Sequence, residues 1–449
     1  MKDFRSVAAL GAALLLVTAS GCDLTVENPN AATLDEVLST RVGVIGFANG
    51  LQRTYAVNTL DNIVLTPGTT AREVAVVRTF ASLQELETGG TGLPGDNGNV
   101  NALFSSLYSV AVDAQRLIDA AQALDGLEPA LEAGLVAIGS FYKAAALGAL
   151  AQNFEQVALA PGGLSPSVYS PRQDAFAEAV RLLSIAEQQA AAAAGNATFR
   201  DLLPTGFDLV NSARAYRARF ALFGGDYAQA IAAANAVPAG ATSVFAYAAD
   251  AQNPLFLAFY QGTPSYAVRD NLGLPAIQAG DRRVDFYTDV DLGPNAEDPA
   301  DDGTLRNDQS NFPIDRAAGF VDDGAEAPLP VYLPDELRLI RAEAIVRSGG
   351  DLAAAVREID AVRTATSDPF GVVAGLPPYS GPVTAAALLD EIYYQRATEL
   401  YLQGLRFEDQ RRFGRPGPST DAFQRNRTFY PYPDQEQQTN PNTPANPAI

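Results

Sequence analysis

Two stretches of this chain combine aromatic rings with planar hydrogen-bonding side chains outside any helical pattern. A sugar ring is bound by a flat apolar ring beside amide, carboxylate or guanidinium groups. The first stretch contains Arg72, Arg78, Phe80 and Asn97, with Asp96 and Asn99 close by. The second contains Tyr260, Tyr266, Arg269, Asn271, Asp281 and Arg282. These residues predict a binding site for a glycan or a peptide, and two arginines near a ring would suit an acidic sugar or another carboxylate.

The composition leaves few routes to catalysis. The chain has no His and one Cys, Cys22, so a Ser/His or Cys/His nucleophile system cannot be built. Glycosidases use a pair of carboxylates, but among 52 acidic residues some pair always looks suitable. We therefore expect no catalytic residues and no enzyme activity.

The charge of the chain restricts its partners. It has 31 Lys and Arg against 52 Asp and Glu, a formal net charge of −21, which excludes the basic surface that nucleic acid requires. Acidic residues are dense between Asp289 and Glu326, including Asp298, Asp301, Asp302, Asp322 and Asp323. Clustered oxygen ligands could hold Ca²⁺, although no segment has EF-hand spacing. We expect no metal and no cofactor, with Ca²⁺ the one ion left open.

The first residues read as a targeting segment. Lys2 and Arg5 precede an apolar run from Val7 to Val17, which is typical of a secretory signal and too short to span a bilayer. Residues 19–22, Ala-Ser-Gly-Cys, resemble a bacterial lipobox, although Ala19 replaces the usual Leu. We expect cleavage after residue 21 and lipidation of Cys22. An ordinary secretory signal with an incidental Cys is the alternative.

The rest of the chain is divided by its helical periodicity into three regions: 22–238, helical; 239–330, a loop-rich insertion; and 331–449, helical with an extended tail after residue 413. Residues 87–99 hold five Gly and a Pro and predict an exposed loop. The helices expected in the first region are Thr33–Tyr55, Val100–Leu124, Leu127–Asn153, Ser170–Ala194 and Leu209–Phe223.

Two segments, 218–237 and 343–362, follow the same pattern of helix, Gly-Gly-Asp and helix. The glycines suit a left-handed helix end, and Asp226 and Asp351 suit the N-cap of the second helix. Apolar residues then recur at helical spacing in both segments. The pattern predicts tetratricopeptide-like helical hairpins without that repeat's full consensus.

Near the C-terminus, residues 391–409 read EIYYQRATELYLQGLRFED. This segment resembles the signature helix of the SusD/RagB family. The matching residues are Arg396, Glu399, Gly404, Arg406, Asp409, Arg412 and Gly414, and the departures are Gln395, Gln403, Phe407 and Gln410. The tail segments 430–436 and 440–442, the segment 27–30 and the segment 281–287 are also similar to family segments.

The signature residues are expected to be structural. Arg396 and Glu399 are three apart on a helix, as are Arg406 and Asp409, so each pair is predicted to interact locally. Such groups would fix the tail to the helical body and would not bind ligand directly.

The resemblance implies a fold, a location and a role. The fold would be all-α for the most part, a tetratricopeptide-like superhelix with a loop-rich ligand-facing subdomain. The protein would be a surface-exposed, lipid-anchored protein of the bacterial outer membrane. It would capture a glycan or another oligomeric nutrient and deliver it to a TonB-dependent, SusC-like transporter. The absence of Trp argues against starch as the glycan. A periplasmic tetratricopeptide-like scaffold that binds only proteins is the alternative.

Overall fold

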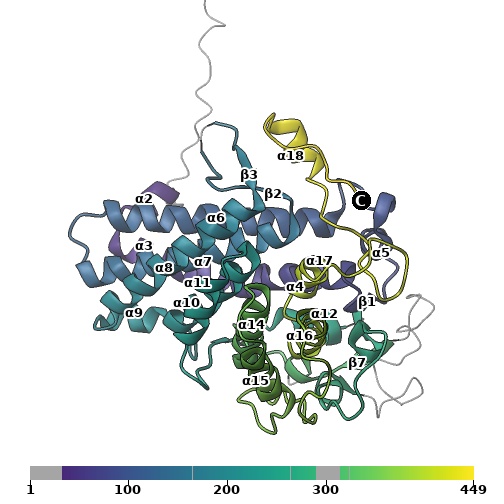
Figure 1. Ribbon diagram of the computed structural model, residues 1–449. Coiled ribbons are helices and arrows are strands. Elements are labelled where there is room, and N and C mark those ends of the chain that lie inside the picture. The colour runs from purple at the N-terminus through teal and green to yellow at the C-terminus, as the bar shows by residue number, and fades with distance from the viewer. Residues whose placement is uncertain (1–32, 164, 263, 290–313, 323) are drawn as a thin grey trace, which may run out of the picture.

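A computed structural model describes residues 33–449 apart from 164, 263, 290–313 and 323 (Figure 1). The predicted signal peptide, Cys22 and the segment 27–30 lie outside the described residues, as do Asp298, Asp301, Asp302 and Asp323. Everything that follows concerns the described part of the chain.

The first half of the chain is built from helices. Their bounds are α2 Leu34–Leu38, α3 Arg41–Asn58, α4 Leu60–Thr70, α5 Ala81–Thr88, α6 Gly98–Ala123, α7 Pro129–Asn153, α8 Arg172–Ala193, α9 Ala197–Leu202, α10 Leu209–Gly224 and α11 Tyr227–Asn235. The expected helix 33–55 is divided into α2 and α3, because Thr40 is extended and its side chain caps α3 by accepting from Gly43 N. The other four expected helices match α6, α7, α8 and α10 within three residues at each end.

Helix α7 is the central element of this half. It packs between α6 and α8, and by length and composition it could cross a bilayer, but its apolar stretch is entirely buried within the fold. Glycine allows neighbouring side chains to approach closely: a Cβ at Gly148 would lie 2.1 Å from the ring of Phe220. α7 is therefore the core helix around which the others assemble.

The second half contains shorter helices and three small sheets. The helices are α12 Pro254–Tyr260, α13 Arg283–Tyr287, α14 Pro334–Arg347, α15 Leu352–Arg363, α16 Ala385–Glu399, α17 Arg406–Arg412 and α18 Asp434–Thr439. The 3₁₀ turns η1, η2 and η3 cover Gly90–Gly92, Asp270–Gly273 and Gly319–Val321. The strands are β1 Val74–Val76, β2 Gln156–Ala158, β3 Tyr169–Pro171, β4 Val244–Phe245, β5 Tyr266–Arg269, β6 Thr288–Asp289, β7 Ile314–Ala317 and β8 Leu329–Pro330.

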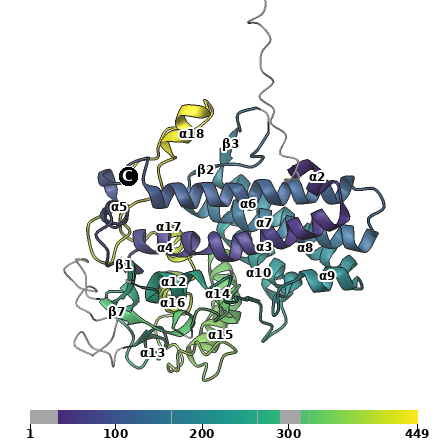
Figure 2. The same ribbon diagram turned by 180° about the vertical axis from the view of Figure 1, so that it is seen from behind.

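The largest sheet has four antiparallel strands in the order β1-β5-β7-β6. The other two pair β2 with β3 and β4 with β8. Figures 1 and 2 show α14, α15, α16 and the four-stranded sheet on one side of the long helices. The expectation of a mostly helical fold is confirmed.

The two helical hairpins have the predicted construction. Gly225 and Gly349 adopt φ of +85° and +71° at the helix ends, a conformation that favours glycine. The Asp226 side chain accepts from Gln229 N at 3.0 Å, and Asp351 accepts from Ala353 N at 2.9 Å. Because α11 of the first hairpin packs on α14 of the second, the hairpins stack in the manner of tetratricopeptide repeats.

The expected single signature helix is broken. α16 ends at Glu399 and α17 begins at Arg406, with Leu402 and Gly404 at positive φ between them. A Cβ on Gly404 would lie 2.5 Å from the carbonyl oxygen of Ile63, so only glycine permits this close backbone approach. The break changes the direction of the chain, and with it the pairing of the charged residues.

The predicted local pairs are wrong, although the structural role holds. Arg396 forms two hydrogen bonds to Asp409, at 2.8 and 3.0 Å, across the break. Glu399 pairs instead with Arg283 at 3.1 Å. Arg406 donates to the carbonyls of Ala397 and Leu272. These groups are all buried, so they hold the core together and are closed to ligand.

The tail crosses the helical body as expected, with α18 as an unexpected short helix. Tyr430 and Tyr432 are fully buried, and the Tyr430 hydroxyl donates to Thr66 O at 3.0 Å. Arg411 in α17 donates to Thr428 O at 2.8 Å and to the carbonyl of Gln152. The tail is therefore fixed to α4 and α7 by buried rings and by bonds from an arginine.

A buried carboxyl, Glu73, joins the sheet to the break between α16 and α17. Its Oε1 accepts from Leu402 N at 3.1 Å and lies 3.8 Å from the Arg406 guanidinium, and Tyr401 OH donates to its carbonyl at 2.9 Å. Burial raises the pKa of Glu73 from an ordinary 4.5 to about 7, with Arg406 opposing. The folded protein therefore keeps a proton that the unfolded chain releases between these two pH values.

This shift predicts a pH-dependent stability. Stability from Glu73 is fully present below pH 4.5 and is lost as the pH rises through 7. Relative to the Glu73→Gln variant, the wild type is expected to lose about 2–3 kcal/mol between pH 5 and pH 8. Urea unfolding of both proteins across this range measures the difference, and a constant difference would contradict the assignment.

Candidate functional site

The four-stranded sheet brings the two predicted binding stretches together. β1 lies between Arg72 and Arg78 in the first stretch, and β5 begins at Tyr266 in the second. The strands pair antiparallel with Val76 opposite Tyr266 and Val74 opposite Val268. Residues almost 200 positions apart therefore share one framework, as a common site requires.

The fold nevertheless buries five of the predicted ligand-binding residues, which argues against direct ligand contact for them. Their side chains are only 1 to 8% exposed: Arg72, Asn97, Tyr266, Arg269 and Asp281. A sugar or peptide cannot reach them from solvent. Each has a structural partner instead, described below.

Arg72 and Arg269 hold the tail against the sheet. Arg72 donates to Glu87 O at 2.6 Å and to Gln424 O at 3.2 Å. Arg269 donates to Val74 O at 3.0 Å, to the Ala422 carbonyl at 3.3 Å and to Glu87 Oε1 at 3.1 Å. Burial lowers the pKa of Arg269 to about 9, with Glu87 opposing, so the guanidinium stays charged at neutral pH. We call this group, Arg72, Arg269 and Glu87, the arginine frame.

The other three buried residues also stabilise local structure. Asn97 caps α6, accepting from Asn99 N at 3.1 Å and Val100 N at 3.3 Å. Tyr266 belongs to the main hydrophobic core. Asp281 pairs with Arg283 at 2.6 Å and accepts from Tyr394 OH at 2.8 Å. Substituting Tyr266 would therefore lower the melting temperature, which distinguishes it from a ligand-binding residue.

Two aromatic side chains are exposed on segments that the arginine frame bonds to. Phe80 is 56% exposed and Phe423 is 44% exposed, the two exposed Phe or Tyr residues in the described part of the chain. Phe423 lies between Ala422 and Gln424, whose carbonyls the frame binds. Phe80 starts α5, the helix that carries Glu87. We call Arg78 and Phe80 the aromatic face, and Phe423 is a separate exposed ring on the tail segment that the frame binds.

Phe80 occupies a position where local structure would favour another residue. It is the N-cap of α5, and its side chain makes no capping hydrogen bond, whereas Ser, Thr, Asp or Asn would. The Arg78 guanidinium lies over the Phe80 ring, 5.4 Å from its centroid. Arg78 Nε is buried and has no hydrogen-bond partner among the described residues. Arg78 is half-buried, and its guanidinium beside the exposed ring offers hydrogen-bond donors and an apolar surface to a ligand.

The remaining predicted ligand-binding residues do not all lie at one site. Arg282 is exposed but lies against Gly375, and its backbone N–H donates to Ala374 O at 3.0 Å. Asn271 is half-buried and donates to Asp270 at 3.3 Å. Arg78, Phe80, Asn271 and Arg282 stay predictions as ligand-binding residues. Phe423 was missed, because nothing in a Pro- and Asn-rich tail marks one Phe as exposed.

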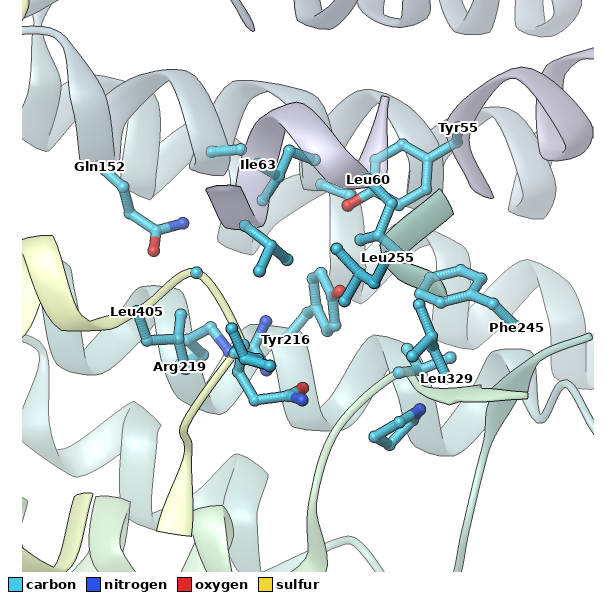
Figure 3. Close-up of a pocket in the computed structure, with 18 of the residues that line it drawn as sticks. Tyr55, Leu60, Ile63, Gln152, Tyr216, Arg219, Phe245, Leu255, Leu329 and Leu405 are labelled. Carbon is cyan, nitrogen blue, oxygen red and sulfur yellow. The ribbon is translucent and has the colours of Figure 1, made fainter. Parts of the chain in front are cut away.

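An internal cavity near the molecule's centre is too small for a nutrient. Its volume is about 30 Å³, room for about two waters, and Tyr55, Gln152, Tyr216 and Arg219 lie around it (Figure 3). Arg219 is fixed by two hydrogen bonds to Glu336, at 2.6 and 2.7 Å, and stacks 4.3 Å from the Tyr216 ring centroid. Arg219 is therefore engaged by the protein itself, and the cavity is a small gap in the core.

The described residues contain no group of three acidic, His or Cys side chains that could hold a metal. Most of the acidic stretch 289–326 lies outside that part of the chain, so Ca²⁺ there stays a prediction.

The C-terminal region, residues 323–448, matches the model of the SusD family. The resemblance to the SusD/RagB family is therefore confirmed. Among solved structures, a SusD-like carbohydrate-binding protein from Bacteroides fragilis aligns with a TM-score of 0.68 at 16% identity, over 90% of this chain and 99% of that one. A SusD superfamily protein from Bacteroides thetaiotaomicron aligns with a TM-score of 0.67 at 14% identity, over 93% of this chain and 100% of that one. NanU of B. fragilis aligns with a TM-score of 0.64 at 14% identity, over 94% of this chain and 99% of that one.

These likenesses extend the SusD fold over nearly the whole described chain. No curated protein matches the sequence. At such low identity the SusD-like structures establish the fold alone.

Proposed function

We propose that this protein captures a glycan on the aromatic face and delivers it to a TonB-dependent outer-membrane transporter of the SusC type. The observation that carries the proposal is the Arg78 guanidinium lying over the exposed Phe80 ring. The ring offers a flat apolar surface to a sugar, and the guanidinium offers donors to its hydroxyl or carboxylate oxygens.

The arginine frame supports this assignment. Binding energy is greatest when the recognition groups are held in place before the ligand arrives. Phe423 is flanked by two carbonyls bound by buried arginines, and Phe80 begins the helix whose Glu87 joins them. The SusD-like structure from B. fragilis is described as carbohydrate-binding, which favours a glycan over a peptide here.

We expect binding without cleavage. With no His in the chain, a catalytic site would depend on carboxylates. Several of the buried carboxylates are bonded to arginine, as in Asp281 with Arg283 and Glu336 with Arg219. Incubation with oligosaccharides followed by assay of new reducing ends tests this, and any release would refute it.

Lipidation at Cys22 would anchor the protein to a membrane, which the proposed role at the outer membrane requires. Mass spectrometry of the native protein and of Cys22→Ala should find acyl chains only in the former. Protease added to intact cells should digest the protein if it faces outward. Protection from protease would favour the alternative, a periplasmic tetratricopeptide-like scaffold that binds only proteins.

Phe80→Ala is expected to lower glycan affinity about tenfold, equivalent to about 1.4 kcal/mol, because it removes the apolar surface under the sugar. Stability should change little, since the ring is mostly in solvent. A printed oligosaccharide array identifies the bound glycan, and isothermal titration of that glycan measures its affinity.

Val42→Ala is the matched control, because Val42 is also an exposed apolar residue, at 78%, but lies in α3. It should bind as the wild type does. Equal affinities for Phe80→Ala and wild type would exclude the aromatic face as the site.

A further inference from the structure

The surface also has a groove, which shares no residue with the aromatic face. Its volume is about 650 Å³, within the usual range for ligand sites. Three elements line it: α6, the hairpin formed by β2 and β3, and α18. Both views show β3 and α18 standing on the same side of α6 (Figures 1 and 2). Nothing in the roles assigned above uses this groove.

One wall is a polar stripe on α6. Asn101, Ser105, Ser109 and Arg116 line the groove and recur at spacings of four and seven residues, so they share one helix face. At 1.5 Å per residue the stripe is about 22 Å long, enough for an extended chain molecule. Ser105 and Ser109 are exposed, and Asn101 Oδ1 is buried without a hydrogen-bond partner among the described residues.

Two tyrosines supply the apolar part of the groove. Tyr108 and Tyr169 both line it and are half-buried. Their hydroxyls are already engaged, because Tyr108 OH accepts from Ala158 N at 2.8 Å and Tyr169 OH donates to Glu436 at 3.1 Å. What they offer a ligand is therefore ring surface held in a fixed orientation.

The charged groups of the groove are largely neutralised by the protein itself. Arg116 pairs with Asp113 at 3.0 Å, and Glu436 accepts from Tyr169 and, at 2.8 Å, from Asn440. Among the described residues of the groove, Arg116 is the one basic side chain, and Asp113 neutralises it. The groove therefore lacks an unpaired positive charge that would select a phosphate or an acidic sugar. Hydroxyls, an amide and fixed rings remain, which suit a ligand rich in hydroxyl groups.

We propose that this groove is a second carbohydrate site, which takes a neutral oligosaccharide in extended form. The ligand class rests on the proposed glycan capture, whereas the place and the residues are independent of the aromatic face. A second contact of this kind would hold a long glycan at two points and raise its effective affinity.

The test compares Ser109→Trp with Gln122→Trp. Ser109 is exposed within the groove, so an indole there fills it, whereas Gln122 is exposed on the same helix outside it. Both variants and Phe80→Ala are probed on a printed array of neutral and acidic oligosaccharides, with melting temperatures to confirm folding. We expect Ser109→Trp to lose at least tenfold of the binding to neutral oligosaccharides, and Gln122→Trp to match the wild type.

Each other outcome overturns the inference. If Ser109→Trp and Gln122→Trp bind alike, the groove takes no glycan, and a loss confined to Phe80→Ala then leaves the proposed function standing. If only acidic oligosaccharides are affected by Ser109→Trp, the assigned ligand class is wrong. If the wild type binds no oligosaccharide, both the proposed function and this inference fail.

Discussion

Arg283→Ala is expected to lower the free energy of unfolding by about 3–5 kcal/mol, the cost of leaving buried charges unpaired. The Arg283 side chain is 0% exposed and donates to Asp281 at 2.6 Å, to Glu399 at 3.1 Å and to Gln395 Oε1 at 2.8 Å. Alanine would remove the cation and leave two carboxylates in the core. Urea unfolding followed by far-ultraviolet circular dichroism measures the loss.

The pH dependence of this loss has a defined sign. Burial raises the pKa of Glu399, and Arg283 opposes that rise, so removing Arg283 favours the protonated carboxyl further. The variant should therefore lose less stability at pH 5 than at pH 8. A loss that is the same at both values would contradict unpaired carboxylates as the cause.

The adjacent Arg282 provides the control. Its side chain is exposed, so Arg282→Ala should change stability by no more than about 0.5 kcal/mol. Arg283→Lys tests geometry as well as charge, because an ammonium cannot reproduce the fork that bonds Asp281, Glu399 and Gln395 together. Similar losses for the Arg282 and Arg283 alanine variants would show that the ion cluster contributes little.

Features set by neighbouring residues could be predicted from the sequence. Gly225 and Asp226 act within one turn of each other, as do Gly349 and Asp351, so helix end and cap were both identified. The pairing of Arg396 was not, because its partner Asp409 is brought across a break. That break depends on the approach of Gly404 to Ile63, a contact between distant segments that a helical pattern does not encode.

In the candidate site, too, features set by neighbouring residues could be predicted, whereas contacts between distant segments could not. The sequence placed Arg78 and Phe80 in a binding stretch, and both lie at the aromatic face. It also placed Arg72 and Arg269 there, but pairing of β1 with β5 buries both. Phe423 could not be found, because its loop is positioned by backbone carbonyls, which every residue possesses.

Arg269→Ala and Arg78→Ala should separate framework from binding surface. Arg269→Ala removes the donor to Val74 O, Ala422 O and Glu87, and leaves a buried carboxylate without its closest cation. We expect it to lower the free energy of unfolding by about 3 kcal/mol. Chemical unfolding of the two variants and the wild type gives the comparison.

Arg78→Ala should give the opposite result. Arg78 forms no ion pair with the described residues and contacts the exposed Phe80 ring, so its removal should change stability by less than about 1 kcal/mol. Its loss should nevertheless lower glycan affinity about tenfold, since the guanidinium is the polar group beside the aromatic surface. If Arg269→Ala were instead stable and deficient in binding, Arg269 would have to reach the ligand, and the frame would not be the rigid support that presents Phe423.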